Sequence, residues 1–243
     1  MSISMKITHE TSPATGAQQA GHKESRQQQP TRLAEQTLAV FPLPLFVLPG
    51  GVQRLRIFEQ RYLAMVSESL VSESLVSESL VSESVAAEST GKGFVIARYD
   101  KAFDFNVPDW GTKVQIIDFH HGEDGLLVID VRANHLVSLD SFDVRGDGLL
   151  MARCHYRDHW PTLAASAKRG ELGLALSALF AKHPQFAELY PQPEFNRLDW
   201  VCARFLEILP LSLNEKEKFI LPGSFPQAKS FLDTFILGQD KIN

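Results

Sequence analysis

The feature that most constrains this fold is a series of short apolar segments between residues 93 and 156. They are rich in β-branched and aromatic residues, as β-strands are. The sequences HHGEDG, ANH and RGDG separate the later segments and are turn signals at hairpin spacing. The segments are 93–99, 112–119, 126–132, 136–144 and 149–156. This pattern predicts a predominantly antiparallel, barrel-like sheet.

A proline-punctuated segment precedes them, LAVFPLPLFVLPGG from Leu38 to Gly51. Proline cannot donate a hydrogen bond to a neighbouring strand, so Pro42 and Pro44 fit an edge strand. The following Pro49, Gly50 and Gly51 indicate a sharp turn. Next, the segment LRIFEQRYLAMV has near-helical apolar spacing and predicts a short amphipathic helix over residues 55–66.

From Trp160 onward the apolar period changes to that of helices. Helical faces run through residues 171–183 and 198–211. Ser212 and Glu215 have the spacing of a capping box that opens a further helix, which Pro222 and Gly223 should end. A last helix is expected at about 227–237, so the second half of the chain is predicted to be a small helical bundle.

These patterns predict an α+β chain with three parts. Residues 1–36 are polar, with few large apolar side chains, and are expected to form a disordered tail. Residues 37–158 should form the β domain, and residues 159–243 the helical bundle.

A five-residue unit, SESLV, repeats from Ser67 to Ser84. On a helix the apolar pair of each unit would turn by about 140° relative to the last, and on a strand it would change face with every copy. Neither geometry gives a constant apolar face. We therefore interpret the tract as an insertion into an existing fold, either extending the preceding helix or forming a mobile loop. An acidic interaction arm is the less favoured reading.

Composition excludes several classes of protein. The two cysteines, Cys154 and Cys202, are too far apart for a disulfide framework or zinc pattern and are expected to be small core side chains. No apolar run approaches the roughly 20 residues of a membrane span, and the first residues lack the apolar block of a signal peptide. We expect a soluble, cytoplasmic protein. The net charge of -5 includes four glutamates of the repeat, so no basic excess favours nucleic acid.

Clusters that could carry chemistry have simpler interpretations. His120 and His121, with Glu123 and Asp124, could bind a metal, but a polar hairpin turn is favoured. His155 and His159 lie where the chain leaves a strand and reaches a proline, which disfavours a shared helical face for the two side chains. Nothing in the local spacing marks a nucleophile, a dinucleotide site or a cofactor site. We predict no catalytic residues, no metal and no cofactor.

Three segments resemble the N-terminal domain of Lon protease, also called the LON substrate-binding domain. They are FPLPLFVLPGGVQRLRIFEQRYLAMV (41–66), VPDWGTKVQIIDFHHGEDGLLVIDVRANHLVSLDSF (107–142) and DWVCARFLEILPLSLNEKEKFIL (199–221), in the order expected of the family. The resemblance implies a PUA-like pseudobarrel of β-strands with one helix, followed by a helical bundle. It also implies a role in recognising protein or peptide substrates for a protease.

The sequence departs from the full-length enzyme of that family. The phosphate-binding pattern G-x-x-x-x-G-K-[ST] is absent: around Gly91 and Lys92, Ala86 replaces the first glycine and Gly93 replaces the hydroxyl residue. We therefore expect no ATPase module and no separate domain for a Ser-Lys dyad in this chain. The resemblance therefore implies a stand-alone, non-catalytic member, in which the repeat is an insertion of roughly 15 residues with a small loop-closure cost.

We expect this module to bind unfolded or extended protein segments and to act as an adaptor that delivers them to a protease in protein quality control. Phe41, Phe46, Phe58 and Tyr62 are the candidate residues of the binding surface. Glu59 and Arg61 are expected to form structural ion pairs that brace the helix against the sheet.

The alternative is a PUA-like protein that binds RNA or a small ligand. The basic residues of the strand region are scattered among acids and form no basic-aromatic stripe, which disfavours RNA. They are Lys113, Arg132, Arg145, Arg153 and Arg157.

Overall fold

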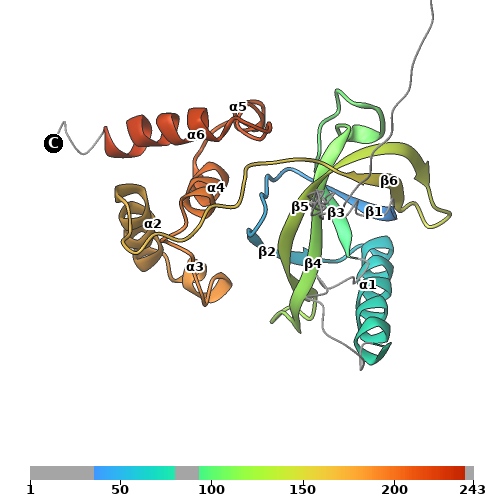
Figure 1. The fold of residues 1–243 in the computed structure, drawn as a ribbon. Coiled ribbons are helices and arrows are strands. Elements are labelled where there is room, and N and C mark those ends of the chain that lie inside the picture. The colour runs from blue at the N-terminus through green and yellow to red at the C-terminus, as the bar shows by residue number, and fades with distance from the viewer. Residues whose placement is uncertain (1–35, 80–92, 239–243) are drawn as a thin grey trace, which may run out of the picture. The chain divides into compact units, whose positions relative to one another are not determined.

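The computed structural model describes residues 36–79 and 93–238, with side chains for residues 36–71 and 93–238 (Figure 1). All of the predicted tail except Gln36 lies outside these residues. So does the end of the repeat, from Leu80 to Ser84.

The described chain contains a six-stranded sheet in the order β2-β5-β4-β3-β1-β6, in which a second pairing of β5 with β6 closes a ring. Only β1 and β3 run parallel; all other pairs are antiparallel. The predicted barrel-like, mainly antiparallel sheet is confirmed. The strands are β1 (Gln36–Leu43), β2 (Val52–Ile57), β3 (Phe94–Arg98), β4 (Trp110–His121), β5 (Leu127–Val144) and β6 (Leu150–Tyr156).

The predicted helix over residues 55–66 is wrong in its first part. Leu55 and Ile57 lie on β2 with their side chains in the core, while Arg54 and Arg56 are exposed. This alternation has the period of a strand, and β2 pairs with the first part of β5. Helix α1 begins only at Gln60.

The prediction that the first strand lies at an edge is also wrong, because β1 pairs with both β3 and β6. Pairing with β6 ends at Val40, however, whereas pairing with β3 continues from Val40 to Leu43. Pro42 therefore lies where β1 has a neighbouring strand on one side only, as far as residues 36–79 and 93–238 show. A residue without a backbone donor is tolerated there.

Helix α1 (Gln60–Ser79) continues through most of the repeat, which confirms helix extension for this part of the tract. The first copy, Ser67–Val71, makes specific contacts that the repeat geometry did not predict. Glu68 forms an ion pair with Arg145, and the buried Ser69 donates to the carbonyl of Met65 at 2.9 Å. Leu70 packs against the barrel core. The first copy is therefore part of the fold.

Five further helices follow the strands in the described chain, and Figure 1 labels them. Ser212 and Glu215 form the predicted capping box, although the helix they open is short. The helices are α2 (Glu171–Lys182), α3 (Pro184–Leu189), α4 (Leu198–Ile208), α5 (Leu213–Glu217) and α6 (Phe225–Leu232), with a π-helical turn at Asp233–Leu237.

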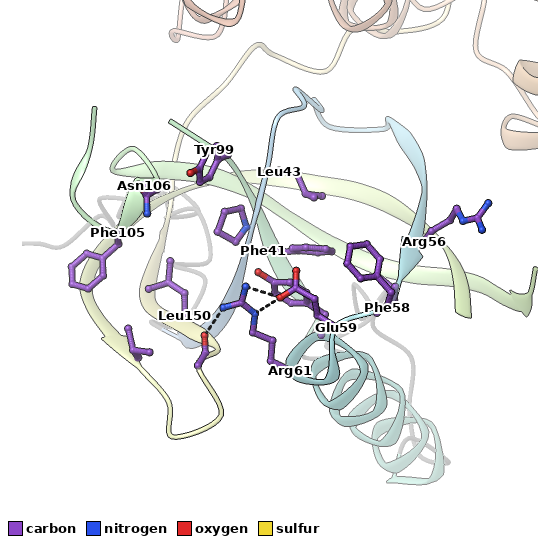
Figure 2. A pocket seen from close by; sticks show the side chains of 15 residues that line it. Phe41, Leu43, Arg56, Phe58, Glu59, Arg61, Tyr99, Phe105, Asn106 and Leu150 are labelled. Atoms are coloured by element: carbon purple, nitrogen blue, oxygen red, sulfur yellow. Dashed lines mark hydrogen bonds and ion pairs between the residues drawn. The ribbon is translucent and has the colours of Figure 1, made fainter. Parts of the chain in front are cut away.

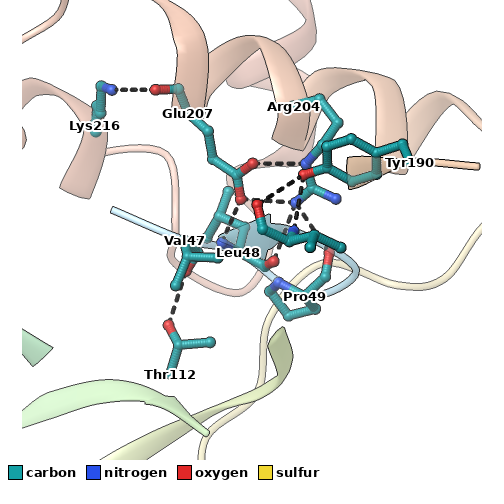
Figure 3. Close-up of polar contacts among 9 residues, drawn as sticks. Val47, Leu48, Pro49, Thr112, Tyr190, Arg204, Glu207 and Lys216 are labelled. Carbon is teal, nitrogen blue, oxygen red and sulfur yellow. Dashed lines mark hydrogen bonds and ion pairs between the residues drawn. The ribbon is translucent and has the colours of Figure 1, made fainter. Parts of the chain in front are cut away.

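A buried ion pair on α4 connects the helices to the turn after β1 (Figure 3). Arg204 and Glu207 are paired at 2.7 Å with side chains 1% and 5% exposed. Glu207 accepts a hydrogen bond from the Leu48 amide at 2.6 Å, and Arg204 donates to the Leu48 carbonyl at 3.0 Å. A Cβ atom on Gly51 would lie 2.5 Å from the Glu207 carboxylate. This contact therefore requires glycine at the predicted Pro-Gly-Gly turn.

The largest core cluster is shared between strands and helices. Phe46, Leu48, Trp110 and Leu136 come from the β region and pack with the apolar faces of α2, α4 and α6. Two further clusters fill the barrel itself. Cys154 and Cys202 are both buried free thiols, as predicted.

Candidate functional site

The candidate site is a groove of about 540 Å³ lined by several aromatic side chains, which we call the aromatic groove (Figure 2). Its wall is built from four parts of the chain that are far apart in sequence. They are the end of β1 (Phe41, Pro42, Leu43), the end of β2 with the start of α1 (Arg56, Ile57, Phe58, Glu59, Arg61, Tyr62), the β3–β4 connection (Tyr99, Phe105, Asn106) and the β5–β6 hairpin (Val144, Gly148, Leu150).

The floor of the groove lies where β1 loses its β6 neighbour. Strand β6 begins at Leu150, opposite Val40, so the next residues of β1 have no strand partner on that side among the described residues. Phe41 stacks on Tyr62, with ring centroids 4.0 Å apart, and both side chains are only 7% exposed. The floor is therefore a fixed aromatic pair, and the open side of β1 lies beside it.

Exposed apolar side chains form the rim. Phe58 is 67% exposed, Phe105 is 47% exposed and Tyr99 is 40% exposed, although large apolar side chains usually pack in a core. Phe105 and Asn106 have φ angles of 57° and 58°, in the left-handed region that costs energy for residues other than glycine. Phe105 is held in this loop by stacking on Phe142 at 5.3 Å. Backbone strain thus accompanies the display of an aromatic ring at the rim.

Arg61 fixes two walls of the groove to each other (Figure 2). Its guanidinium pairs with Glu59 at 2.7 Å and donates to the carbonyl of Gly148 at 3.0 Å. It also lies over the ring of Tyr62, 4.7 Å from the centroid. The predicted structural ion pair of Glu59 and Arg61 is confirmed, and it joins the start of α1 to the β5–β6 hairpin.

The charges at the groove are balanced within the protein. Arg56 forms an ion pair with Asp124, as Arg61 does with Glu59. Burial raises the pKa of Tyr62, so its hydroxyl stays protonated at neutral pH. Because the arginines are already paired, the groove offers mainly aromatic and aliphatic surface, which suits apolar side chains better than phosphates.

Three of the four predicted surface residues come together in this groove. Phe41 and Tyr62 form its floor and Phe58 its rim. Phe46 lies elsewhere: it is 6% exposed and packs edge-on against Trp110 in the core shared with the helices. The side chain of Lys216 covers that ring, with its nitrogen 5.9 Å from the centroid.

The histidines considered as metal ligands have other partners or are exposed. His120 and His121 lie exposed at the end of β4. His155 contacts Asp140, whereas His159 bonds to the carbonyl of Ile220. Within the described residues, no group of three or more His, Cys, Asp or Glu side chains is arranged to hold a metal ion.

The two thiols have surroundings that oppose ionisation. Burial raises the pKa of Cys154 to about 11 and that of Cys202 to about 12, so both remain protonated at neutral pH. A thiol needs a lowered pKa to act as a nucleophile. Neither cysteine has such an environment.

Sequence reasoning missed most of the rim and the hairpin wall. Tyr99 is the last residue of the predicted strand segment 93–99, and Phe105 belongs to the connection after it that the strand pattern left unassigned. Two phenylalanines within the polar stretch DKAFDFN were the available signal, because aromatic residues in a polar turn often serve an interface. Val144 and Gly148 lie on the hairpin, and only the folded ring brings them beside β1.

With this geometry in view, solved structures provide a comparison. The structure is similar to that of a Lon N-terminal domain protein from Xanthomonas campestris, with 26% sequence identity and a TM-score of 0.50, over 76% of this chain and 89% of that one. It also matches the N-terminal domain of the Mycobacterium avium complex Lon protease at 13% identity and a TM-score of 0.48, over 82% and 97% of the two chains. No protein-family model matches the sequence, and no curated protein does.

The first of these matches confirms the resemblance to Lon N-terminal domains that the sequence predicted. It covers the greater part of both chains and supports the mixed strand and helix architecture described above. In the described chain, no helix has the length and apolar character needed to cross a membrane.

Proposed function

We propose that the chain is a non-catalytic binding module that holds apolar, extended segments of other proteins in the aromatic groove. The observation that carries this proposal is the exposure of Phe58, Tyr99 and Phe105 around a groove whose arginines are paired. Similarity to a Lon N-terminal domain protein supports the same class of function. Delivery of the bound segment to a protease would be the role of such a module in protein quality control.

The size and shape of the groove fit this ligand. Its volume of about 540 Å³ falls within the roughly 300–1,000 Å³ of ordinary ligand pockets and can take a few apolar side chains. Beside it, the part of β1 from Phe41 to Leu43 pairs with no strand of the described chain on the side where β6 has ended. An extended peptide can lie along an open strand while its side chains enter adjacent pockets.

The test is binding of fluorescent peptides rich in aromatic and aliphatic residues, measured by anisotropy. The variant Phe58→Ser with Phe105→Ser should weaken binding at least tenfold, because aromatic residues central to an interface often contribute about 2 kcal/mol or more. Phe58 and Phe105 are 67% and 47% exposed and neither belongs to a core cluster, so the variant should stay folded.

Phe119→Ser is the matched control, since Phe119 is 54% exposed but does not line the groove. It should bind peptides as the unchanged protein does. If Phe119→Ser weakens peptide binding as much as the double variant does, the groove has no specific role. Unchanged peptide binding by the double variant would also contradict the proposal.

A further inference from the structure

A proline stands on the open edge of β1, in the wall of the aromatic groove. Pro42 lines the groove and lies in the part of β1 that continues past the last pair with β6, which is Val40 with Leu150. Beyond that pair, no strand of the described chain covers this edge of β1. A segment bound in the groove can therefore approach the backbone of Pro42.

The hydrogen bonds of β1 show which way Pro42 faces. The carbonyl of Leu43 accepts a hydrogen bond from the Tyr99 amide at 2.9 Å, so the backbone groups of Leu43 point toward β3. Backbone groups of successive residues in a strand point to opposite sides. Pro42 therefore directs its carbonyl to the open edge, the side on which Val40 pairs with β6. Because proline has no N–H, this part of the edge offers one acceptor and no donor.

An edge of this kind resists the addition of a strand. The proline ring takes the place of the amide hydrogen and keeps another backbone at a distance, and proline on an exposed edge blocks pairing in many sheets. Pro44 also lacks an N–H and follows two residues later, just past the end of β1. A bound segment thus gains little from having the backbone donors of a strand.

The side chains of the groove provide apolar contact surface instead. Phe58, Tyr99 and Phe105 present exposed rings at the rim, beside the stacked Phe41 and Tyr62. Aromatic grooves suit proline-rich segments, because such a segment is already extended and loses little entropy when it binds. Such a segment also needs few backbone partners, since each proline lacks an N–H.

Given the peptide-binding function above, on which this specificity rests, we propose that Pro42 makes the aromatic groove selective for apolar segments that contain proline. The groove contacts their side chains and does not add them to the sheet as a strand beside β1. Placing proline at alternate positions of a bound segment therefore leaves its affinity unchanged or raises it. A site that binds by adding a strand loses affinity on the same change, because proline removes donors of the pairing.

Fluorescent peptides of equal length, flanked by lysines for solubility, test this specificity by anisotropy. The first alternates valine with leucine, and the others carry N-methyl groups or prolines on alternate residues, prepared in both registers. The N-methylated peptides should bind within about twofold of the first, and the proline peptides at least as tightly as the first. Phe58→Ser with Phe105→Ser should weaken the binding of all of them, as expected for one shared groove.

Pro42→Val gives β1 the missing donor and tests the residue itself. Valine suits a strand, and without the proline ring this position can exchange both backbone hydrogen bonds with a bound segment. The variant should bind the first peptide at least about threefold more tightly than an N-methylated one, as a typical hydrogen bond would require. Pro161→Val replaces an exposed proline outside the groove and should show no such preference.

The possible results distinguish this specificity from the function itself. If the first peptide binds but the N-methylated or proline peptides bind at least about threefold more weakly in both registers, the role of Pro42 is overturned and the groove remains a peptide site. Equal binding of the first and the N-methylated peptides by Pro42→Val would also overturn it. If none of the peptides binds, the proposed function is contradicted as well.

Discussion

At the scale of single residues, the buried Arg204–Glu207 ion pair bonds α4 to the backbone of the turn after β1. Replacing Glu207 with glutamine keeps an acceptor near the Leu48 amide but leaves the buried Arg204 charge without its counter-ion. Breaking a buried pair from one side costs about 3–5 kcal/mol. We expect Glu207→Gln to lower the free energy of unfolding by about this amount in urea denaturation.

Glu188→Gln is the appropriate control, since Glu188 forms an exposed ion pair with Arg54. Exposed pairs typically contribute up to about 1 kcal/mol, so this variant should unfold almost as the unchanged protein does. A loss of less than about 1 kcal/mol in Glu207→Gln would show that the pair does not hold the turn.

His159 gives the protein a pH dependence of defined sign. Burial lowers the pKa of its imidazole, which stacks on Trp160 and contacts the Ile220 carbonyl. Its unfolded-state pKa is about 6.5, so below this pH the unfolded chain takes up a proton that the folded chain resists. The stability that His159 contributes is therefore present above about pH 6.5 and is lost as the pH falls through its lowered folded-state pKa.

The comparison is thermal unfolding of the unchanged protein and of His159→Asn at pH 7.5 and pH 5.5. The variant lacks the titrating ring, so the unchanged protein should lose more stability on acidification. An identical loss in both proteins would mean that His159 does not sense pH in this range.

At the scale of elements, the first copy of the repeat packs against the barrel, and we expect that the later copies can be removed. Deleting residues 72–81 removes two copies but keeps the residues whose contacts hold α1 to the barrel, Glu68, Ser69 and Leu70. We expect the free energy of unfolding to change by less than about 0.6 kcal/mol, since loop-closure costs vary slowly with length.

Leu70→Ser tests whether the first copy of the repeat stabilises the fold. Leu70 is partly buried against the barrel core, and losing its apolar contact should cost about 1 kcal/mol or more. If the deletion destabilises the protein more than this single substitution does, the later copies contribute to the fold.

The sequence predicted most elements where one period dominates. The strands between residues 93 and 156 and the capping box at Ser212 lie close to their expected positions. Strand β2 was missed because Leu55 and Ile57 suit both a strand and, together with Tyr62, a helix. Segments 126–132 and 136–144 form one continuous strand, β5. Its pairing with β4 and with β6 contains register shifts, at which one strand has an extra residue relative to its partner.

The candidate site was less predictable than the fold for a geometric reason. Phe41, Phe58 and Tyr62 come from one stretch of sequence, so a local pattern was enough to select them. Phe46 belongs to the same stretch, yet the turn after β1 directs it to the helices. The rest of the groove depends on ring closure, which brings Tyr99 and Gly148 to the same surface, and no local period encodes that.

At the scale of the whole molecule, the shared core predicts that strands and helices unfold together. The three tryptophans all lie in the cluster that includes Phe46 and Leu48 from the β region. Tryptophan fluorescence therefore reports on this junction, whereas far-ultraviolet circular dichroism reports on all strands and helices. The two probes should give coincident urea transitions, as in two-state unfolding.

Separate transitions would contradict cooperative folding and support the division into independent domains at residues 158 and 159. In that case a fragment ending at residue 158 should fold alone. The shared core predicts that such a fragment instead exposes Phe46, Leu48, Trp110 and Leu136 and aggregates.

The central claim, that the aromatic groove binds extended apolar protein segments, is tested most directly by site-specific photocrosslinking. A photoreactive phenylalanine analogue is placed at Phe58, Phe105 or Phe119 and irradiated with a permanently unfolded protein. A folded protein serves as the competitor. We predict crosslinks from positions 58 and 105, resistant to the folded competitor, and none from position 119. Equal crosslinking from all three positions, or none from the groove, would contradict the account.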